Sequence, residues 1–599
     1  MATSSSKKSV TPARNKPAPA KRSGPVKKSP PSKKTGPVKP AKPAKPAKPL
    51  KPVKPPKPVK PNKPVKPPKP VKPPTPGPFS GRIDNVSVRM YCLGTGDCFL
   101  VKFCSGDHPV FTMMIDCGSC QGKAADFLPY LTDLSGSLTN KTIDLLVITH
   151  EHNDHVNGFA KCIDVFKDLT IREAWFAWTE NPADPGGAAT ALKTKQKKMK
   201  MALRNAINAV TENQKAFAAN TQPNAYRNPL ADNHDAFMCG LNTLAEINLN
   251  DTDTGDDDNA GSLPGMQKIK QLLADKKVKV RYLNPGDTVT LPDLPGLNFY
   301  VLGPPSDQEH VYKDGKQGTD VYNKSLALND SSLAVNAFIG MTDAASKKDL
   351  PFSSSYVLEG GVPGATTAKE EPLAKVDLST RVNPLTKADP SMKDKSQYVI
   401  DAYSDAKNDW RKIDDDWLNG AGALALRLNS HINNTSLVLA IEFPETKKVV
   451  LFPGDAEFGS WESWHLISHW LEKGADKKPW AQDLLRRTVF YKVGHHLSYN
   501  GTALEKGIMM MESPELAAMA TLDRRRIAKA WTSTMPNKFL LQELIRRTQG
   551  KFFIMDEFEI VGGPSQQLDP STLGKTVYTA GTDADGKKVL YKQYTVRNL

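Results

Sequence analysis

Four side chains that can bind a metal ion lie within six consecutive residues of this chain. Residues 150–155 read His150-Glu151-His152-Asn153-Asp154-His155 and are separated only by Thr149 from a mostly apolar run at 143–148. The apolar run predicts a buried strand, and because side chains alternate along a strand, His150 and His152 can face the same way. Imidazole and carboxylate groups are the ligands that zinc-class ions prefer. The segment therefore predicts two metal ions side by side at the end of a strand, and a polar loop with chance histidines is a poor alternative.

Further segments accompany this motif in a defined order along the chain. They are a glycine-rich segment at 90–100, a predicted strand at 113–118 ending in Asp116-Cys117-Gly118, a strand pair at 436–443 and 449–457 that contains Gly454-Asp455, and a strand at 489–496 ending in His495-His496. Together with the histidine motif, this order resembles the metallo-β-lactamase-fold superfamily of metallohydrolases. More narrowly, it resembles the branch that contains the hydrolase domain of bacterial competence (DNA-uptake) proteins. The resemblance implies an α/β fold, a four-layer αβ/βα sandwich with the site at the sheet edges.

The resemblance also implies a ligand set for two divalent metal ions. It assigns His150 and His152 to the first ion, Asp154 and His155 to the second, and Asp455 as the aspartate that bridges both. Zn2+ is the expected ion, with Mn2+ as an alternative. A water held between two such ions loses a proton near neutral pH and becomes a nucleophile. Asp154 would orient this water and pass protons.

Two ligand positions stay open in the sequence. His495 and His496 both fit the terminal ligand of the second ion, and we favour His495 because it directly follows Val493-Gly494. His431 lies in a predicted loop at 430–436 and could complete the first site, although the competence-type branch tends to have an Asn-rich loop without that ligand. Asp116 is expected to accept a hydrogen bond from a ligand histidine.

Lys492 and Tyr499 flank the terminal histidines. Both are candidates to hold the anionic part of a substrate.

The positive charge of the chain is concentrated at its N-terminus. Residues 1–80 hold 22 of the 81 Lys and Arg residues and no Asp or Glu, so the remainder has 59 basic against 64 acidic residues. Residues 1–80 are also rich in Lys-Pro repeats, which predicts a disordered, extended basic tail. The tail could bind nucleic acid or another polyanion through phosphate neutralisation, act as a spacer or surface anchor, or only increase solubility.

The remaining residues predict an intracellular protein with two insertions in its core. No apolar run approaches the roughly 20 residues needed to span a bilayer, and the seven cysteines show no disulfide spacing, so we expect a cytoplasmic protein. The sequence does not indicate an oligomeric state. The predicted parts are the tail at 1–80, a first half of the core at 82–179, a helical and acidic-loop insertion at 180–277, a core hairpin at 278–305, a second insertion at 306–423 and a second half of the core at 424–599.

Three functions are compatible with this pattern. The first is a dinuclear-metal hydrolase that uses a metal-bound hydroxide on phosphodiesters, most simply a nuclease. The second is a metal-dependent esterase, lactonase or phosphodiesterase for small molecules, whose insertions form a lid. The third is a non-catalytic assembly or polyanion-binding protein that uses the basic tail. A deep, narrow and largely apolar pocket would favour the second function over the first, which needs an open basic groove.

Overall fold

The computed structural model describes residues 81–120, 122–184, 186–220, 229–249, 263–313, 315, 320, 416–470, 480–527, 535–556 and 579–599. The chain divides into two units, Met1–Thr75 and Pro76–Leu599, and all that follows concerns the second. The predicted basic tail at 1–80, most of the second insertion at 306–423 and most of the acidic run at 249–261 lie outside the described residues.

Two mixed β-sheets form the centre of the second unit. The first sheet has the strand order β14-β15-β1-β2-β3-β4-β5-β6, and the second has the order β13-β12-β11-β10-β9-β8-β7. The strands of the first sheet are β1 Asn85–Tyr91, β2 Phe99–Ser105, β3 His108–Ile115, β4 Thr142–Ile148, β5 Thr170–Ala177, β6 Lys279–Leu283, β14 Thr579–Thr582 and β15 Val589–Arg597. Those of the second are β7 Thr288–Leu291, β8 Leu294–Gly303, β9 Val438–Phe443, β10 Lys448–Phe452, β11 Thr488–Lys492, β12 Ala517–Ala520 and β13 Phe552–Ile554.

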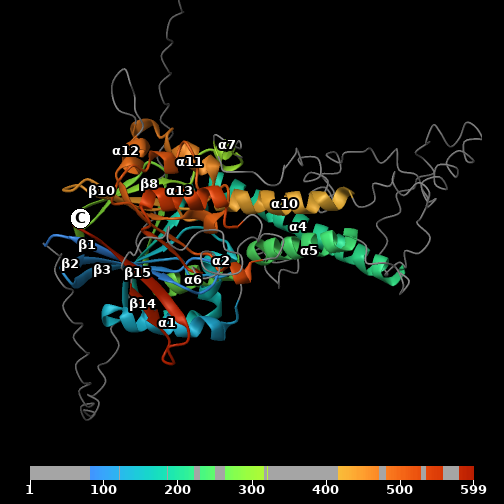
Figure 1. Ribbon diagram of the computed structural model, residues 1–599, viewed down its shortest axis with the longest axis horizontal. Coiled ribbons are helices and arrows are strands. Elements are labelled where there is room, and N and C mark those ends of the chain that lie inside the picture. Colours follow the sequence, from blue (N-terminus) through green and yellow to red (C-terminus); the bar gives the residue numbers. More distant parts are fainter. Residues whose placement is uncertain are drawn as a thin grey trace, which may run out of the picture. The chain divides into compact units, whose positions relative to one another are not determined.

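Helices cover the outer face of each sheet, which gives four layers (Figure 1). The helices beside the first sheet are α1 Ala124–Ser137, α2 Asn153–Lys161, α3 Ile163–Lys167 and α6 Pro264–Asp275, and those beside the second are α11 Phe458–Trp464, α12 Trp480–Arg486 and α13 Lys538–Thr548. Short helices lie at α7 Gln308–Val311, Thr139–Lys141, Trp178–Glu180, Ser468–Trp470, Gly494–Leu497, Ile508–Met510 and Arg524–Arg526. This arrangement confirms the predicted αβ/βα sandwich.

The sequence of strand β4 is apolar on both faces because both faces are buried. Leu145 and Val147 pack into the core between the two sheets, whereas Leu146 and Ile148 pack against the outer helices. A central strand that pairs in parallel on both edges has no face toward water, so nearly every residue is apolar. The histidine motif begins where this buried strand leaves the sheet.

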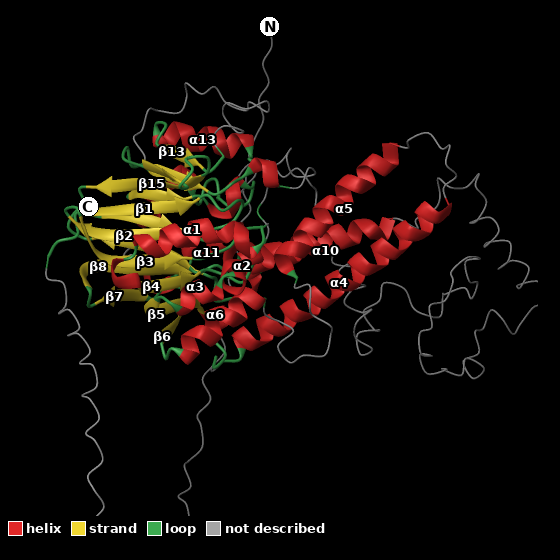
Figure 2. Ribbon diagram, turned by 90° about the horizontal axis from the view of Figure 1, so that it is seen from below, coloured by secondary structure: helices red, strands yellow, loops and turns green. Residues whose placement is uncertain are grey.

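Three long helices form a separate bundle next to the sandwich, and Figure 2 shows them extending away from the sheets. They are α4 Ala188–Asn220, α5 Pro229–Asn248 and α10 Asp416–Asn433, and they share an apolar core built from Leu203, Leu241 and Leu428 among others. The helix α10 crosses the predicted boundary at residue 424. It packs with the first insertion although it lies more than 160 residues further along the chain.

The last described segment of the chain pairs with the first strand. Strand β15 pairs with β1 along Asn85–Tyr91, so residues 579–599 belong to the first sheet. Among the described helices, none is long and apolar enough to cross a membrane.

Gly118 illustrates how closely the loops of the site are packed. A Cβ atom at this position would lie 2.3 Å from the carbonyl carbon of Asp154 and 2.4 Å from the amide nitrogen of His155. Since both neighbours are backbone atoms at the start of α2, the loop cannot accept a side chain without moving the histidine motif.

We expect Gly118→Ala to lower the free energy of unfolding by about 3 kcal/mol, at the upper end of the usual cost of overpacking. Gly136→Ala is the matched control, because no atom lies within 4 Å of its Cβ position and alanine in a helix is more stable than glycine by about 0.5–1 kcal/mol. Urea denaturation of both variants measures the difference. Equal stabilities would contradict the close packing of Gly118 against α2.

Candidate metal centre

The turn between β4 and α2 presents the histidine motif at the sheet edge. Strand β4 ends at Ile148, and His152 is the N-cap residue of α2 with extended backbone angles. Asp154 lies in the first turn of the helix, where the positive end of the helix dipole favours a carboxylate. His150, His152, Asp154 and His155 are all buried, whereas Asn153 is partly exposed, so the possible metal ligands of the motif point into the protein.

The second sheet supplies the opposite side of the site. Asp455 follows β10, and the short helix Gly494–Leu497 follows β11. His495, His496 and Leu497 all have left-handed backbone angles, with φ of 45°, 48° and 64°. Non-glycine residues rarely adopt this conformation, and three in succession are held here by the surrounding structure. The resulting tight turn directs His496 into the site.

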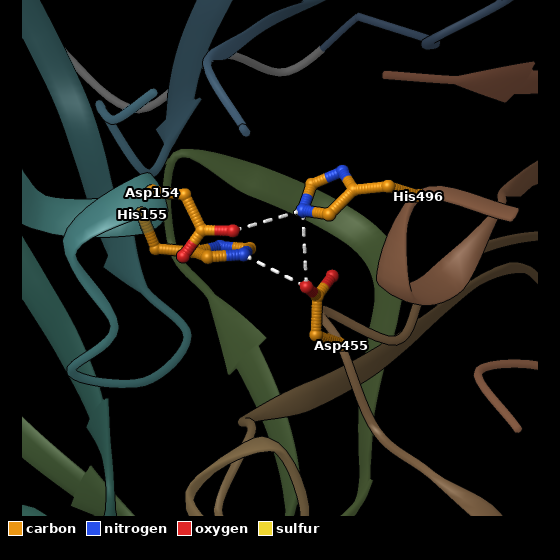
Figure 3. A group of neighbouring side chains, drawn as sticks. All are labelled: Asp154, His155, Asp455 and His496. Carbon is orange, nitrogen blue, oxygen red and sulfur yellow. Dashed lines mark hydrogen bonds and ion pairs between the residues drawn. The ribbon is translucent and has the colours of Figure 1, made fainter. Parts of the chain in front are cut away.

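Asp154, His155, Asp455 and His496 form a compact group of possible ligands (Figure 3). Nε2 of His155 lies 3.0 Å from Oδ2 of Asp455, and Nε2 of His496 lies 3.2 Å from the same oxygen and 3.1 Å from Oδ2 of Asp154. Two ligand atoms of a tetrahedral zinc ion, each about 2.0–2.1 Å from the metal, are roughly 3.3 Å apart. The four side chains are therefore spaced as the ligands of one ion.

His150 and His152 lie beside this group and face each other. Nε2 of His150 is 3.0 Å from Nδ1 of His152, and the ring of His150 is 4.1 Å from that of His155 between centroids. Burial lowers the pKa of His150 well below its usual value and that of His152 to about 4. Both rings are therefore neutral, as a metal ligand requires.

Two hydroxyl groups contact Nδ1 of His150 on the side away from His152. The Thr149 hydroxyl donates to Oδ2 of Asp116 at 2.5 Å, so at 3.0 Å from Nδ1 of His150 it can only accept. The Ser436 hydroxyl lies 3.2 Å from the same nitrogen. Nε2 of His150 therefore has His152 as its neighbour, and a cation between the two rings could bind Nε2 of His150 and Nδ1 of His152 together.

Hydrogen bonds also orient the ligands of the second group. Oδ2 of Asp116 lies 2.8 Å from Nδ1 of His155, which agrees with the role expected for Asp116. Nδ1 of His496 lies 2.8 Å from the carbonyl oxygen of Thr521. Partners of this kind fix the ring orientation of a metal-bound histidine and raise its basicity.

The structure places Lys492 among the buried carboxylates and not among the described residues that line the pocket. Its side chain is 2% exposed and forms an ion pair with Asp97. It also contacts Oδ1 of Asp455 at 2.9 Å and the carbonyl oxygen of Gly454 at 2.8 Å. Since an ammonium group has three donors and all are used, Lys492 cannot hold a substrate anion. It positions the side chain of Asp455.

The charges of the site suit divalent cations. Asp97, Asp116, Asp154 and Asp455 are at most 3% exposed, and Lys492 is the lysine that contacts this group among the described residues. Buried carboxylates without positive partners are costly. Oδ1 of Asp154 is also buried with no hydrogen-bond partner in the described part of the chain. Both observations fit a pair of bound metal ions.

The pKa values of His155 and His496 show the effect of these negative charges. Burial by itself would lower the pKa of His155, but the carboxylates of Asp455 and Asp97 raise the pKa of this ring well above its usual value. Burial by itself would also lower the pKa of His496, but the carboxylates of Asp455 and Asp154 raise it to about 10. The group therefore attracts positive charge strongly.

His495 lies at the pocket and not in the ligand group. Its Nδ1 is 3.3 Å from Oε1 of Glu457 and 2.8 Å from the Ser498 hydroxyl. The structure thus differs from our preference between the two neighbours, because the left-handed turn points successive side chains in different directions. His496 is the histidine that meets Asp154 and Asp455.

His431 does not lie in the ligand group either. Its ring packs edge-on against Tyr312, with 4.1 Å between centroids. The predicted loop at 430–436 begins as the last turn of α10, and residues four apart share a face of a helix whereas residues two apart do not. Asn429 and Asn433 therefore line the pocket, and His431 points elsewhere.

Tyr499 packs, half-buried, against the core of the second sheet. It is not among the described residues that line the pocket.

A narrow cavity of about 30 Å³ opens over the ligand group. Thr243 and Ile247 of α5, Asn429 and Asn433 of α10, and Met535 form much of its wall. None of the described residues that line it is lysine or arginine. The inserted bundle therefore supplies one side of the pocket, with neutral polar and apolar groups.

Sequence reasoning missed several residues of this site. Asp97 belongs to the glycine-rich segment at 90–100, and this motif could have marked it as a residue of the site. Cys120 lines the pocket, and its thiol is 3.7 Å from Oδ2 of Asp154. Asn248 is hydrogen-bonded to His152, and no pattern in the sequence marks this residue of the insertion.

Comparison with known proteins finds a similarity in the first part of the sandwich. No curated protein and no solved structure gives a significant match. Residues 93–186, which include the motif at 150–155, match the family model of the metallo-beta-lactamase superfamily. The two sheets with helices on their outer faces are consistent with the sandwich fold of that superfamily.

Proposed function

We propose that this protein is a dinuclear-metal-dependent hydrolase that cleaves phosphodiesters. One observation carries the proposal. The donor atoms of Asp154, His155, Asp455 and His496 converge at the sheet edge, directly beside the facing nitrogens of His150 and His152. Oδ2 of Asp455 lies 3.0 Å from Nε2 of His155 and 3.2 Å from Nε2 of His496, and its charge also acts on His150 and His152, as expected for a ligand shared by two ions.

The metal ions, when bound, would supply a hydroxide near neutral pH and stabilise the negative charge that develops on the substrate oxygen. The chain provides the supporting groups. His150 and His152 would hold the first ion, and Asp154, His155 and His496 the second. Oδ1 of Asp154, which has no partner in the described part of the chain, is placed to orient the attacking water and to accept its proton.

The choice of a phosphodiester rests on the resemblance to the competence-type branch and not on the pocket. A second function is favoured by the cavity itself, which is narrow and has no lysine or arginine among its described lining residues. Such a pocket suits a small ester, lactone or small phosphodiester better than a nucleic-acid duplex. A purely structural role is disfavoured, because so many buried carboxylates need cations.

Metal content and substrate range, measured on the full-length protein, test the proposal. We expect close to two metal ions per chain and cleavage of bis-p-nitrophenyl phosphate. The double variant Asp154→Ala/His155→Ala should lose bound metal and should no longer cleave bis-p-nitrophenyl phosphate. Single- and double-stranded DNA and RNA distinguish a nuclease from a small-molecule enzyme, for which p-nitrophenyl acetate and a simple lactone are the matching probes. Absence of both metal and turnover in the wild-type protein would overturn the proposal.

The basic tail is expected to retain a polyanionic substrate in the case of a nuclease. A variant lacking residues 1–80 should then cleave nucleic acid less efficiently at low salt, and the difference should shrink as salt rises, because phosphate neutralisation depends on salt. Cleavage of bis-p-nitrophenyl phosphate should not change.

A further inference from the structure

The helices of the insertion contact three consecutive residues of the histidine motif, Glu151, His152 and Asn153. Glu151, completely buried, forms an ion pair with Lys200 of α4 at 2.6 Å. Nε2 of His152 lies 3.0 Å from Oδ1 of Asn248, the last residue of α5. The amide group of Asn153 donates to two backbone carbonyls near the same helix end, at 2.7 and 3.2 Å. The insertion therefore contacts the metal-binding loop itself.

The orientation of the Asn248 amide is determined by its other partners. Nδ2 of Asn248 donates to the carbonyl oxygen of Leu244 at 2.8 Å and to Oδ1 of Asn429 on α10 at 3.1 Å. A side-chain amide nitrogen has two hydrogens, and both are used. Since Asn248 is completely buried, its oxygen must face His152, and an amide oxygen can only accept.

This hydrogen bond decides which nitrogen of His152 is available. If Nε2 donates to Asn248, a neutral ring has its lone pair on Nδ1. Nδ1 is the atom that lies 3.0 Å from Nε2 of His150. The lone pair of His152 then points toward Nε2 of His150, and a metal ion between the two rings could bind both nitrogens.

We propose that Asn248 is a positioning residue of the first metal site, so that the helical insertion is an integral part of the metal centre. This inference rests on the proposed function, because it requires that His150 and His152 hold the first ion. Without the oxygen of Asn248, the ring of His152 is free to turn or to carry its proton on Nδ1. Asn429 acts one step further away, by holding the amide of Asn248.

Metal affinity tests this role independently of turnover. Wild type, Asn248→Leu and Asn248→Asp are loaded with Zn2+ and titrated with the chromogenic chelator 4-(2-pyridylazo)resorcinol. Asn248→Leu keeps the approximate shape but has no acceptor, and we expect one of the two ions to bind about 10–100-fold more weakly, the usual effect of removing such a partner. Asn248→Asp keeps an acceptor oxygen and should bind that ion more tightly than Asn248→Leu. The second ion should be unaffected.

Asn85→Ala is the matched control, because Asn85 is a buried asparagine in β1 whose side-chain amide donates to Asp84 and to the carbonyl oxygen of Gly106, away from the site. It should leave both affinities unchanged. If Asn248→Leu fails to fold, Asn429→Ala takes its place, with a smaller loss at the same ion. Two ions bound by Asn248→Leu as tightly as by wild type would overturn the inference while leaving the proposed function intact. A wild-type protein without metal would overturn both.

Discussion

Replacement of Asp455 with alanine is expected to abolish hydrolysis and to reduce metal content to less than one ion per chain. Its carboxylate contacts both histidines of the second group, at 3.0 Å from His155 and 3.2 Å from His496, and lies beside the first. Loss of the metals removes several kcal/mol of charge stabilisation, so we expect kcat/KM for bis-p-nitrophenyl phosphate to fall by more than ~10³-fold. Elemental analysis and steady-state kinetics on the same preparation measure both effects.

Two variants separate this role from a loss of fold. Asp455→Asn keeps the shape of the side chain and an acceptor for Lys492, and should therefore remain folded while its metal content and activity fall. Asp133→Asn is the matched control, because Asp133 pairs with Arg89 and Tyr91 away from the site and should leave activity unchanged. Activity of Asp455→Asn within tenfold of wild type, at full metal content, would contradict the assignment.

Replacement of Lys492 with methionine is expected to destabilise the metal-free protein by about 3–5 kcal/mol, the usual cost of leaving buried charges without a partner. Burial by itself would lower the pKa of Lys492, but Asp455 and Asp97 raise it above its usual value, so the lysine is charged and balances both aspartates. Denaturation in urea with a chelator present measures the loss. Bound zinc should reduce the difference, because cations then compensate Asp455.

A double-mutant cycle tests whether Asp97 is a charge partner of Lys492. Asp97→Asn removes one of the two carboxylates, and Lys492→Met should therefore cost less in the Asp97→Asn background than in the wild-type protein. If Lys492 instead held a substrate anion, Lys492→Met would raise KM and leave stability unchanged. That pattern would contradict a structural role for Lys492.

Much of the fold was accessible from local patterns in the sequence. The alternation in Val86, Val88 and Met90, which all face the core between the sheets, predicts β1 because a strand repeats every two residues. The apolar run before His150 predicts β4 for a similar reason. The spacing of the motif at 150–155 predicts ligands, because a strand followed by a helix places those side chains together. Strand periodicity and motif spacing can both be read from residues that are close together in the sequence.

The choice between neighbouring histidines required the tertiary structure. Nothing in the sequence indicates three successive left-handed residues at 495–497, and only this turn makes His496 the residue that reaches Asp455. Similarly, the extension of α10 through residue 433 places Asn433 at the pocket and turns His431 away, whereas the sequence suggested a loop.

The sequence by itself determined individual strands and the placement of a histidine and aspartate motif at a strand end, because short-range periodicity and motif spacing are local properties, and the two-sheet sandwich was implied by the resemblance to a known superfamily. Only the tertiary structure decided that Asp97 pairs with Lys492 and that Asn248 contacts His152. The partners in these contacts are 395 and 96 residues apart in the numbering of the chain. Contacts of this kind depend on how the sheets and inserted helices pack, and long-range packing leaves no periodic signal in a single sequence.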